Sequence, residues 1–174
     1  MQEPSPQPSA DGVITRVGRF VQRVQNDETG CRMERALEVV GTRSALILLR
    51  EVYYGSRRFD DLVLHTGLTE AVTSQRLKRL VASGLLQRQP YREQGQRTRY
   101  EYVLTEMGRD FFPVFVAFME WGARLGDDDG VELAHDGCGS PLRAVVQCLD
   151  GHSVSLSETV ARFSSDRTEG VQSA

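Results

Sequence analysis

The apolar pattern of this chain changes its period at Gly84, and this change limits the folds that are open to it. Before Gly84, apolar residues recur every three or four positions, which predicts a short helix over 59–66, closed by Gly67, and a second helix over 69–83. After Gly84 the helical period ends, and strands are expected over 85–91 and 99–104 around a polar tip, with Tyr100 and Tyr102 on one face of the second strand and Val103 on the other. Two helices joined by a tight glycine-containing turn form a helix-turn-helix, so the sequence predicts this motif followed directly by a β-ribbon.

Further helices are expected on both sides of this motif. Apolar spacing predicts helices over 31–40 and 43–54 before it and a long helix over 106–125 after it. Pro113 costs about 3 kcal/mol inside a regular helix, so we expect a kink or a late helix start there. Near the ends of the chain, the spacing predicts an amphipathic helix over 13–25, and Asp150-Gly151 predicts a small hairpin between 142–148 and 152–156.

These elements predict a mainly α protein with a small β ribbon, which is an α+β fold. Their order is that of a winged helix-turn-helix, here with terminal dimerisation helices and a small C-terminal hairpin. The expected divisions are a disordered tail (1–12), an N-terminal helix and linker (13–30), the winged domain (31–125), an acidic linker with the hairpin (126–163) and a second tail (164–174).

Charge is distributed unevenly along the chain. The net charge of −3 argues against a generally basic nucleic-acid coat protein, yet Glu93 is the only acidic residue among the basic residues between Arg76 and Arg99. Such a stretch can contact the phosphates of double-stranded DNA. The longest apolar runs fall well short of the roughly 20 residues that a membrane span needs, and the polar start lacks the apolar core of a secretory signal. We therefore expect a cytoplasmic protein that does not bind membranes.

The helix over 69–83 has the two faces that a recognition helix needs. One face is apolar and seats the helix, while Gln and Arg on the other can pair with adenine and guanine in the major groove. Arginines on a projecting ribbon can neutralise phosphates or enter a narrow minor groove. The alternative is an ordinary amphipathic helix with a solvated face, but a basic ribbon directly after it favours DNA binding. The candidate DNA-binding residues are Thr69, Ala71, Ser74, Gln75, Lys78, Arg79, Arg92, Arg97 and Arg99.

An ordered set of short motifs resembles the HxlR-type regulators, a MarR-like branch of the winged-helix proteins. The resemblance covers 31 to about 121 and rests on 58–62 (RFDDL), 67–69 (GLT), 76–80 (RLKRL), 84–86 (GLL) and 102–108 (YVLTEMG). It implies a homodimer whose recognition helices enter successive major grooves of a near-palindromic operator. The chain departs from the family at Arg43-Ser44, at Ala71 and Thr73, and in a longer wing tip, which leaves the operator sequence open.

The cysteines suggest two further kinds of site. Cys31 matches a cysteine that serves some members of this family as a thiol sensor, and the N-terminus of a helix lowers a thiol pKa; the alternative is a small buried hydrophobic residue. Two pairs, His135 with Cys138 and Cys148 with His152, could build a tetrahedral zinc site. The place of a further family cysteine is taken by Asp150-Gly151, so the expectation is that no metal or other cofactor is bound.

Two stretches, 13–24 and 111–121, carry more apolar surface than a small winged helix can bury. This surplus predicts a homodimer. The expected interface residues are Val17, Phe20, Val24, Phe111, Phe115, Phe118 and Trp121. The alternative is that these helices cover each other within one chain.

The expected function is a dimeric bacterial DNA-binding transcription regulator switched by thiol oxidation. The alternative is a regulator or partner-binding protein that takes a small-molecule effector in the aromatic dimer cleft or the C-terminal hairpin. An enzyme is disfavoured, because the sequence has no Ser/His/Asp set, nucleotide-binding glycine loop or paired catalytic carboxylates at a plausible spacing.

Overall fold

The structure is a computed structural model that describes residues 13–22, 30–92, 95, 97–126 and 130–166. It divides into two compact units, a larger unit of Gly30–Ala144 and a terminal unit of Met1–Thr29 with Val145–Ala174. The predicted tail over 1–12, and 167–174 of the second tail, lie outside the described residues. Within those residues, no helix is long and apolar enough to span a membrane.

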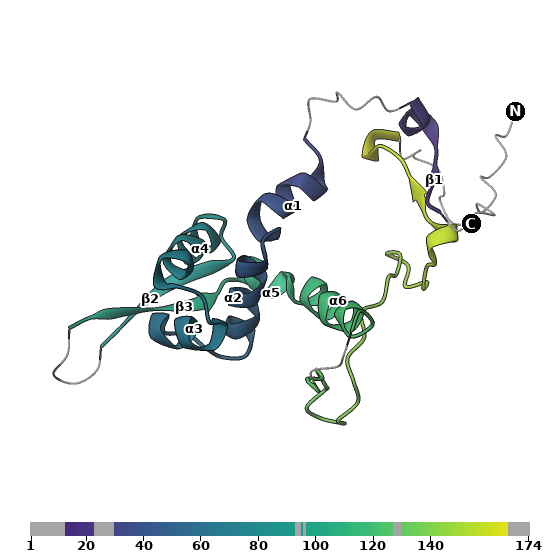
Figure 1. Cartoon of the computed structure of the whole chain (residues 1–174). Coiled ribbons are helices and arrows are strands. Elements are labelled where there is room, and N and C mark those ends of the chain that lie inside the picture. The colour runs from purple at the N-terminus through teal and green to yellow at the C-terminus, as the bar shows by residue number, and fades with distance from the viewer. Residues whose placement is uncertain (1–12, 23–29, 93–94, 96, 127–129, 167–174) are drawn as a thin grey trace, which may run out of the picture. The chain divides into compact units, whose positions relative to one another are not determined.

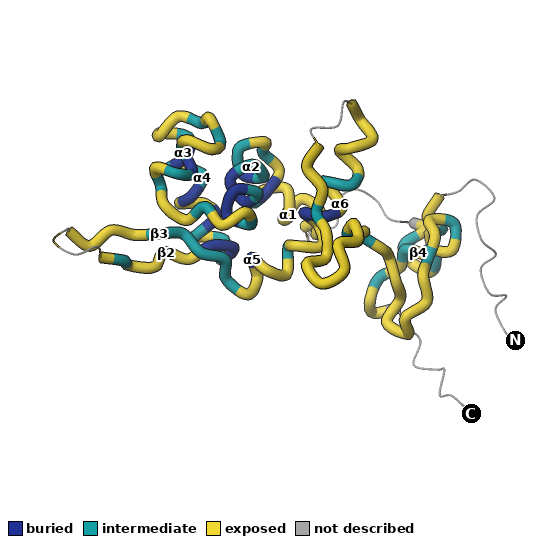
Figure 2. Tube along the Cα trace, turned by 90° about the horizontal axis from the view of Figure 1, so that it is seen from below, coloured by how far each residue is buried: buried dark blue, intermediate teal, exposed yellow. Residues whose placement is uncertain are grey.

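Four helices form the centre of the larger unit. They are α1 (Arg32–Val40), α2 (Arg43–Tyr53), α3 (Phe59–Thr66) and α4 (Glu70–Ala82), close to the helices predicted from the spacing. Thr42 caps α2 by accepting a hydrogen bond from the Ala45 amide at 3.3 Å. Leu48, Leu49 and Leu62 are fully buried in one core that α2 to α4 share, which Figure 2 shows as the concentration of buried residues.

The ribbon after α4 is an antiparallel pair of strands, β2 (Leu86–Tyr91) and β3 (Arg99–Leu104). Leu86 lies opposite Leu104 at the buried end, and Tyr91 lies opposite Arg99 near the tip. Figure 1 shows the ribbon projecting from the helices α2 to α4. A single antiparallel bridge joins Glu101 to Arg58, just before α3, so the wing is anchored to the start of the helix-turn-helix. The observed order of elements confirms the predicted winged helix-turn-helix and its α+β class.

The last helical stretch of this unit is broken near Pro113, as predicted. It consists of α5 (Glu106–Asp110) and α6 (Phe112–Gly122), with Pro113 in the first turn of α6, where its missing N–H costs no hydrogen bond. Phe115 of α6 stacks on Tyr53 of α2, with ring centroids 4.9 Å apart. This contact seats α6 on the core.

The terminal unit differs from the sequence prediction. In place of a helix over 13–25, the chain forms β1 (Thr15–Arg16) and the short 3-10 helix η1 (Gly18–Gln22). The strand β1 pairs in parallel with β4 (Val160–Ala161), and Val17 donates a backbone hydrogen bond to Ala161. The helix prediction is wrong because 15–16 pairs with a distant strand and Phe20 packs on Phe163, while Val13, Ile14 and Val21 stay exposed. The unit also contains η2 (Leu156–Glu158) and η3 (Ser164–Asp166).

The predicted C-terminal hairpin is present only as its innermost turn. One antiparallel bridge joins Gln147 to Ser153 around Asp150-Gly151. The Val154 amide also donates a hydrogen bond to the Val146 carbonyl, but the pairing does not reach Leu142, which donates its backbone hydrogen bond to Leu133 instead. They close a separate turn, with a bridge between Ala134 and Pro141.

Candidate nucleic-acid interface

Helix α4 has one face in the core and the opposite face in solvent. Thr69 caps it by accepting a hydrogen bond from the Val72 amide at 3.4 Å. Thr73, Leu77 and Leu80 are buried, which fixes the rotation of the helix. The outward face carries most of the predicted DNA-binding side chains of this helix: Ala71, Gln75, Lys78 and Arg79 are exposed, and Ser74 is half-buried.

Arg76 lies in the basic stretch but does not belong to this outward face. Its Nε atom donates a hydrogen bond to Ser44 Oγ at 2.9 Å, and the residue is half-buried. Ser44 lies in the first turn of α2, so this contact holds α4 against α2. Arg76 therefore orients the interface, and Lys78 and Arg79 provide the outward charge of α4.

The wing carries its predicted arginines on exposed positions. Arg99 begins β3, while Arg92 and Arg97 flank the tip, and all three residues are exposed. Glu93, the acidic residue of this stretch, lies outside the described residues. The described wing therefore presents cationic side chains near its tip, where phosphate binding needs them.

A shallow groove between the start of α3 and the outer part of the wing contains two arginines that are not among the predicted DNA-binding residues. Arg58 lies over the ring of Tyr91 at 4.9 Å, and Arg88 lies over the ring of Tyr100 at 4.1 Å. These cation–π contacts hold the guanidinium groups beside Arg99, which also lines the groove. The signal for Arg88 was in the sequence, because strand alternation places it on the face shared by Tyr100 and Tyr102.

Cys31 is the N-cap residue of α1, as the sequence predicted, and it is half-buried. Its backbone amide donates a hydrogen bond to the Glu34 carboxylate at 3.3 Å, and Arg32 and Arg35 are exposed in the same turn. The thiol therefore lies at the first turn of a helix that is itself part of the winged domain.

The two histidine–cysteine pairs lie in different units. His135 Nδ1 lies 3.4 Å from Cys138 Sγ in the larger unit, and Cys148 Sγ lies 3.5 Å from His152 Nδ1 in the terminal unit. Hydrogen bonds from Ser140 lower the pKa of the Cys138 thiol. All four residues are exposed, and each pair is formed within a single turn.

The predicted interface residues divide into buried and exposed ones. Phe115 is only 5% exposed and Phe111 packs against the core, so these two rings serve the fold of a single chain. Phe20 is half-buried and lies 5.4 Å from Phe163 between ring centroids, within the terminal unit. Phe118 and Trp121 are 47% and 58% exposed, whereas Val24 lies outside the described residues. The exposed apolar surface of α6 is therefore narrower than predicted.

Comparison with known proteins identifies the family to which this domain is similar. The profile of the HxlR-like helix-turn-helix family matches residues 39–129. An uncharacterised HTH-type transcriptional regulator of Mycobacterium tuberculosis is 44% identical over 108 residues, which are 60% of this chain and 67% of the relative. The regulator YdeP of Bacillus subtilis is 30% identical over 103 residues, which are 59% of this chain and 79% of the relative.

Solved structures agree with these relatives. The candidate transcription factor PA1607 superposes with a TM-score of 0.69 at 28% identity, covering 80% of this chain and 99% of that one. The redox regulator HypR in its oxidised form superposes with a TM-score of 0.51 at 29% identity, covering 56% of this chain and 100% of that one. The profile match, the curated relatives and the winged domain agree: this chain belongs to the HxlR-like helix-turn-helix family of transcription regulators, and residues 39–129 contain its DNA-binding domain.

Proposed function

We propose that this regulator binds a near-palindromic operator as a homodimer, with α4 in the major groove and the wing on the adjacent backbone or minor groove. The observation that carries this proposal is the division of α4 into two faces. Its buried residues fix the rotation of the helix, and its exposed residues are those with base-reading or phosphate-binding chemistry.

Each residue of this surface has an expected role. Gln75 can pair bidentately with adenine and Arg79 with guanine, while Lys78, Ser74 and the cap residue Thr69 contact phosphates. Ala71 leaves room for the approach to a thymine methyl group. In the wing, Arg92, Arg97 and Arg99 attract the DNA phosphates, and this attraction does not depend on the base sequence.

The dimer is proposed from the apolar side chains that the larger unit leaves in solvent. Met33 and Leu37 of α1 and Phe118 and Trp121 of α6 are exposed. Such patches usually mark an interface, and a two-fold dimer buries the same patch on both subunits. It also places two recognition helices about 34 Å apart, one turn of DNA.

Sedimentation of the full chain at micromolar concentration tests the dimer. We expect a dimer for the parental chain and a monomer for Trp121→Glu, because a buried unpaired carboxylate is costly. Leu149→Glu is the matched control, since Leu149 is 97% exposed in the terminal unit. A parental chain that sediments as a monomer contradicts the dimer, and so does a Trp121→Glu variant that remains dimeric.

Selection of bound duplexes from a random pool, followed by sequencing, tests operator binding. We expect an enriched motif of two inverted half-sites with centres about 10–11 base pairs apart. Enrichment of one half-site alone would contradict symmetric binding, and the absence of any enriched motif would contradict base readout.

We also propose that oxidation of Cys31 changes the affinity of the dimer for DNA. The support is its position at the first turn of α1 and the similarity of the domain to HypR, a redox regulator solved in reduced and oxidised forms. DNA binding with and without diamide tests this proposal. The response should disappear in Cys31→Ser and persist in Cys138→Ser and Cys148→Ser. A response that persists in Cys31→Ser assigns sensing to another residue and refutes the proposal.

A further inference from the structure

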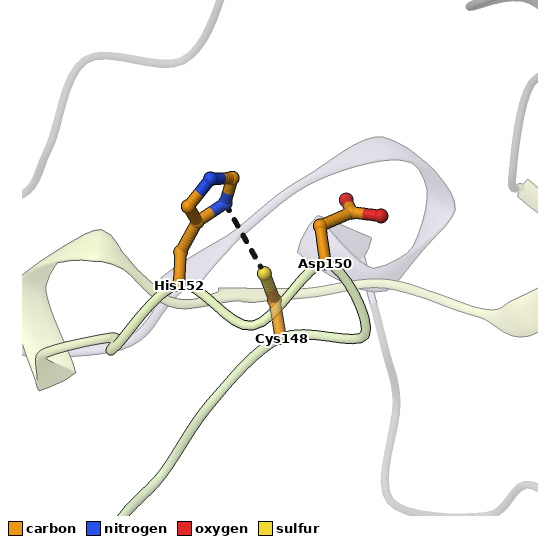
Figure 3. A group of neighbouring side chains, drawn as sticks. All are labelled: Cys148, Asp150 and His152. Atoms are coloured by element: carbon orange, nitrogen blue, oxygen red, sulfur yellow. Dashed lines mark hydrogen bonds between the residues drawn. The ribbon is translucent and has the colours of Figure 1, made fainter.

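A tight turn in the terminal unit brings together three side chains that can ligate a metal. The Cys148 amide donates a hydrogen bond to the His152 carbonyl at 3.0 Å, and the Gly151 amide donates to the Cys148 carbonyl at 3.0 Å. Gly151 has a φ of +82°, a conformation that favours glycine, so it allows the chain to reverse here. Figure 3 shows the side chains of Cys148 and His152 directed toward each other, with Asp150 at the turn beside them.

The distances between the donor atoms are close to those of a tetrahedral zinc site. Zinc bonds of about 2.3 Å to sulfur and about 2.0–2.2 Å to nitrogen or oxygen place tetrahedral ligand atoms about 3.4–3.6 Å apart. Cys148 Sγ and His152 Nδ1 are 3.5 Å apart, which is the separation that two such ligand atoms have. The three donor atoms all lie within 4.8 Å of one another. The Asp150 side chain is exposed, so a change of rotamer can bring its carboxylate closer to the other two donors.

The other histidine–cysteine pair provides an internal comparison. His135 and Cys138 have a similar spacing of 3.4 Å, which a hydrogen bond between a thiol and an imidazole explains. Within the described part of the chain, however, the turn at Cys148 is the one place where three such donors gather. The third ligand distinguishes this turn from a hydrogen-bonded pair.

The described part of the terminal unit has no buried core. Where burial is described in this unit, at 13–21 and 145–165, no residue is buried. Small units of this kind usually depend on disulfides, a structural metal or association. Cys148 is the single cysteine of the unit, so a disulfide within it is excluded.

We propose that Cys148, Asp150 and His152 bind one Zn²⁺ ion that stabilises the terminal unit. Cys148 binds as a thiolate and releases its proton to water, His152 binds through Nδ1, and Asp150 binds through a carboxylate oxygen. Water completes the tetrahedron as the fourth ligand. This site is independent of DNA binding and of the Cys31 thiol.

Cobalt titration of the full, untagged and reduced chain tests the site. Co²⁺ serves as the probe because its bond to a thiolate gives a charge-transfer absorption band. Added Zn²⁺ should displace the bound Co²⁺, and the band should then disappear. We expect one Co²⁺ per chain, and at least about tenfold weaker binding after Cys148→Ser, Asp150→Ala or His152→Ala. His135→Ala and Cys138→Ser are the matched controls and should bind as the parental chain does.

Hydrogen exchange supplies a second measurement that does not depend on absorption. Zinc should slow exchange of the Cys148 and Val154 amides, which are hydrogen-bonded across this turn, and it should not do so in His152→Ala. Amides of α2 and α4 report whether each variant is folded. The absence of a thiolate–cobalt band in the parental chain would overturn the proposal. Equal loss of binding in His135→Ala would overturn the assignment of the site to this turn alone.

Discussion

Gly108 lies where α5 approaches Leu85 and Leu104 closely, so its replacement by alanine tests the packing of the domain. A Cβ atom at Gly108 would collide with the carbonyl oxygen of Leu85, and it would lie 3.1 Å from the carbonyl carbon of Leu85 and 3.2 Å from Leu104 Cδ2. Two of these atoms are backbone, so they cannot rotate away. The Gly108 carbonyl also accepts a hydrogen bond from Tyr53 Oη at 2.6 Å, which restrains the helix from withdrawing.

The expected cost follows from these contacts. Overpacking costs about 1–3 kcal/mol, and the backbone obstacles place Gly108→Ala at the upper end. The higher helix propensity of alanine offsets about 1 kcal/mol of this cost. The free energy of unfolding should therefore fall by about 2 kcal/mol. Gly122→Ala is the matched control: nothing lies within 4 Å of its added Cβ, so it should stabilise the domain by about 0.5–1 kcal/mol.

Urea unfolding followed by far-ultraviolet circular dichroism measures both changes. We expect the midpoint of Gly108→Ala to fall and that of Gly122→Ala to rise, at an unchanged dependence on urea. If Gly108→Ala unfolds at the parental midpoint, the packing of α5 against Leu85 is wrong.

Three further predictions concern single side chains. Burial raises the pKa of Tyr53 to about 12, against about 10 unfolded, so the folded state keeps this proton to a higher pH. The contribution of Tyr53 to the urea midpoint should therefore be constant below about pH 10 and fall as the pH rises toward 12, so the midpoint should fall less over this range in Tyr53→Phe. Arg97→Ala should weaken binding to all duplexes alike and lower the slope of log affinity against log salt by about one unit, and an unchanged slope shows that the wing does not contact phosphates. Thr69→Ala should cost about 1 kcal/mol in urea unfolding through loss of the cap, and a parental midpoint contradicts that role.

The helix-turn-helix and the wing could be predicted because their signals are local. Apolar spacing, the cap residue Thr69 and the breaks at Gly67 and Gly84 all act within a few residues of the structure they determine. The break near Pro113 was predicted for the same reason. Strand alternation also gave the full extent of β3.

The failures come from contacts between distant parts of the chain. The segment that contains Phe20 has helical spacing, but its partners are Val160 to Phe163, which no local signal reveals. Phe115 was expected at a subunit interface because its spacing matches Phe118, yet Tyr53 covers it within the chain. Periodicity shows which residues share a face and does not show what covers that face. The interface, the thiol switch and a small-molecule effector remain predictions.

Base readout by α4 is the central claim, and a comparison of preferred DNA sequences tests it most directly. Duplex selection and sequencing should be repeated with Gln75→Ala and Arg79→Ala, alongside Arg124→Ala, a charge-matched control on an exposed residue just after α6. Each α4 variant should lose base preference at one position per half-site, by about 1–3 kcal/mol, because one bidentate contact is removed. The control should keep the parental motif. Parental preference at every position in both α4 variants would contradict the placement of α4 in the major groove.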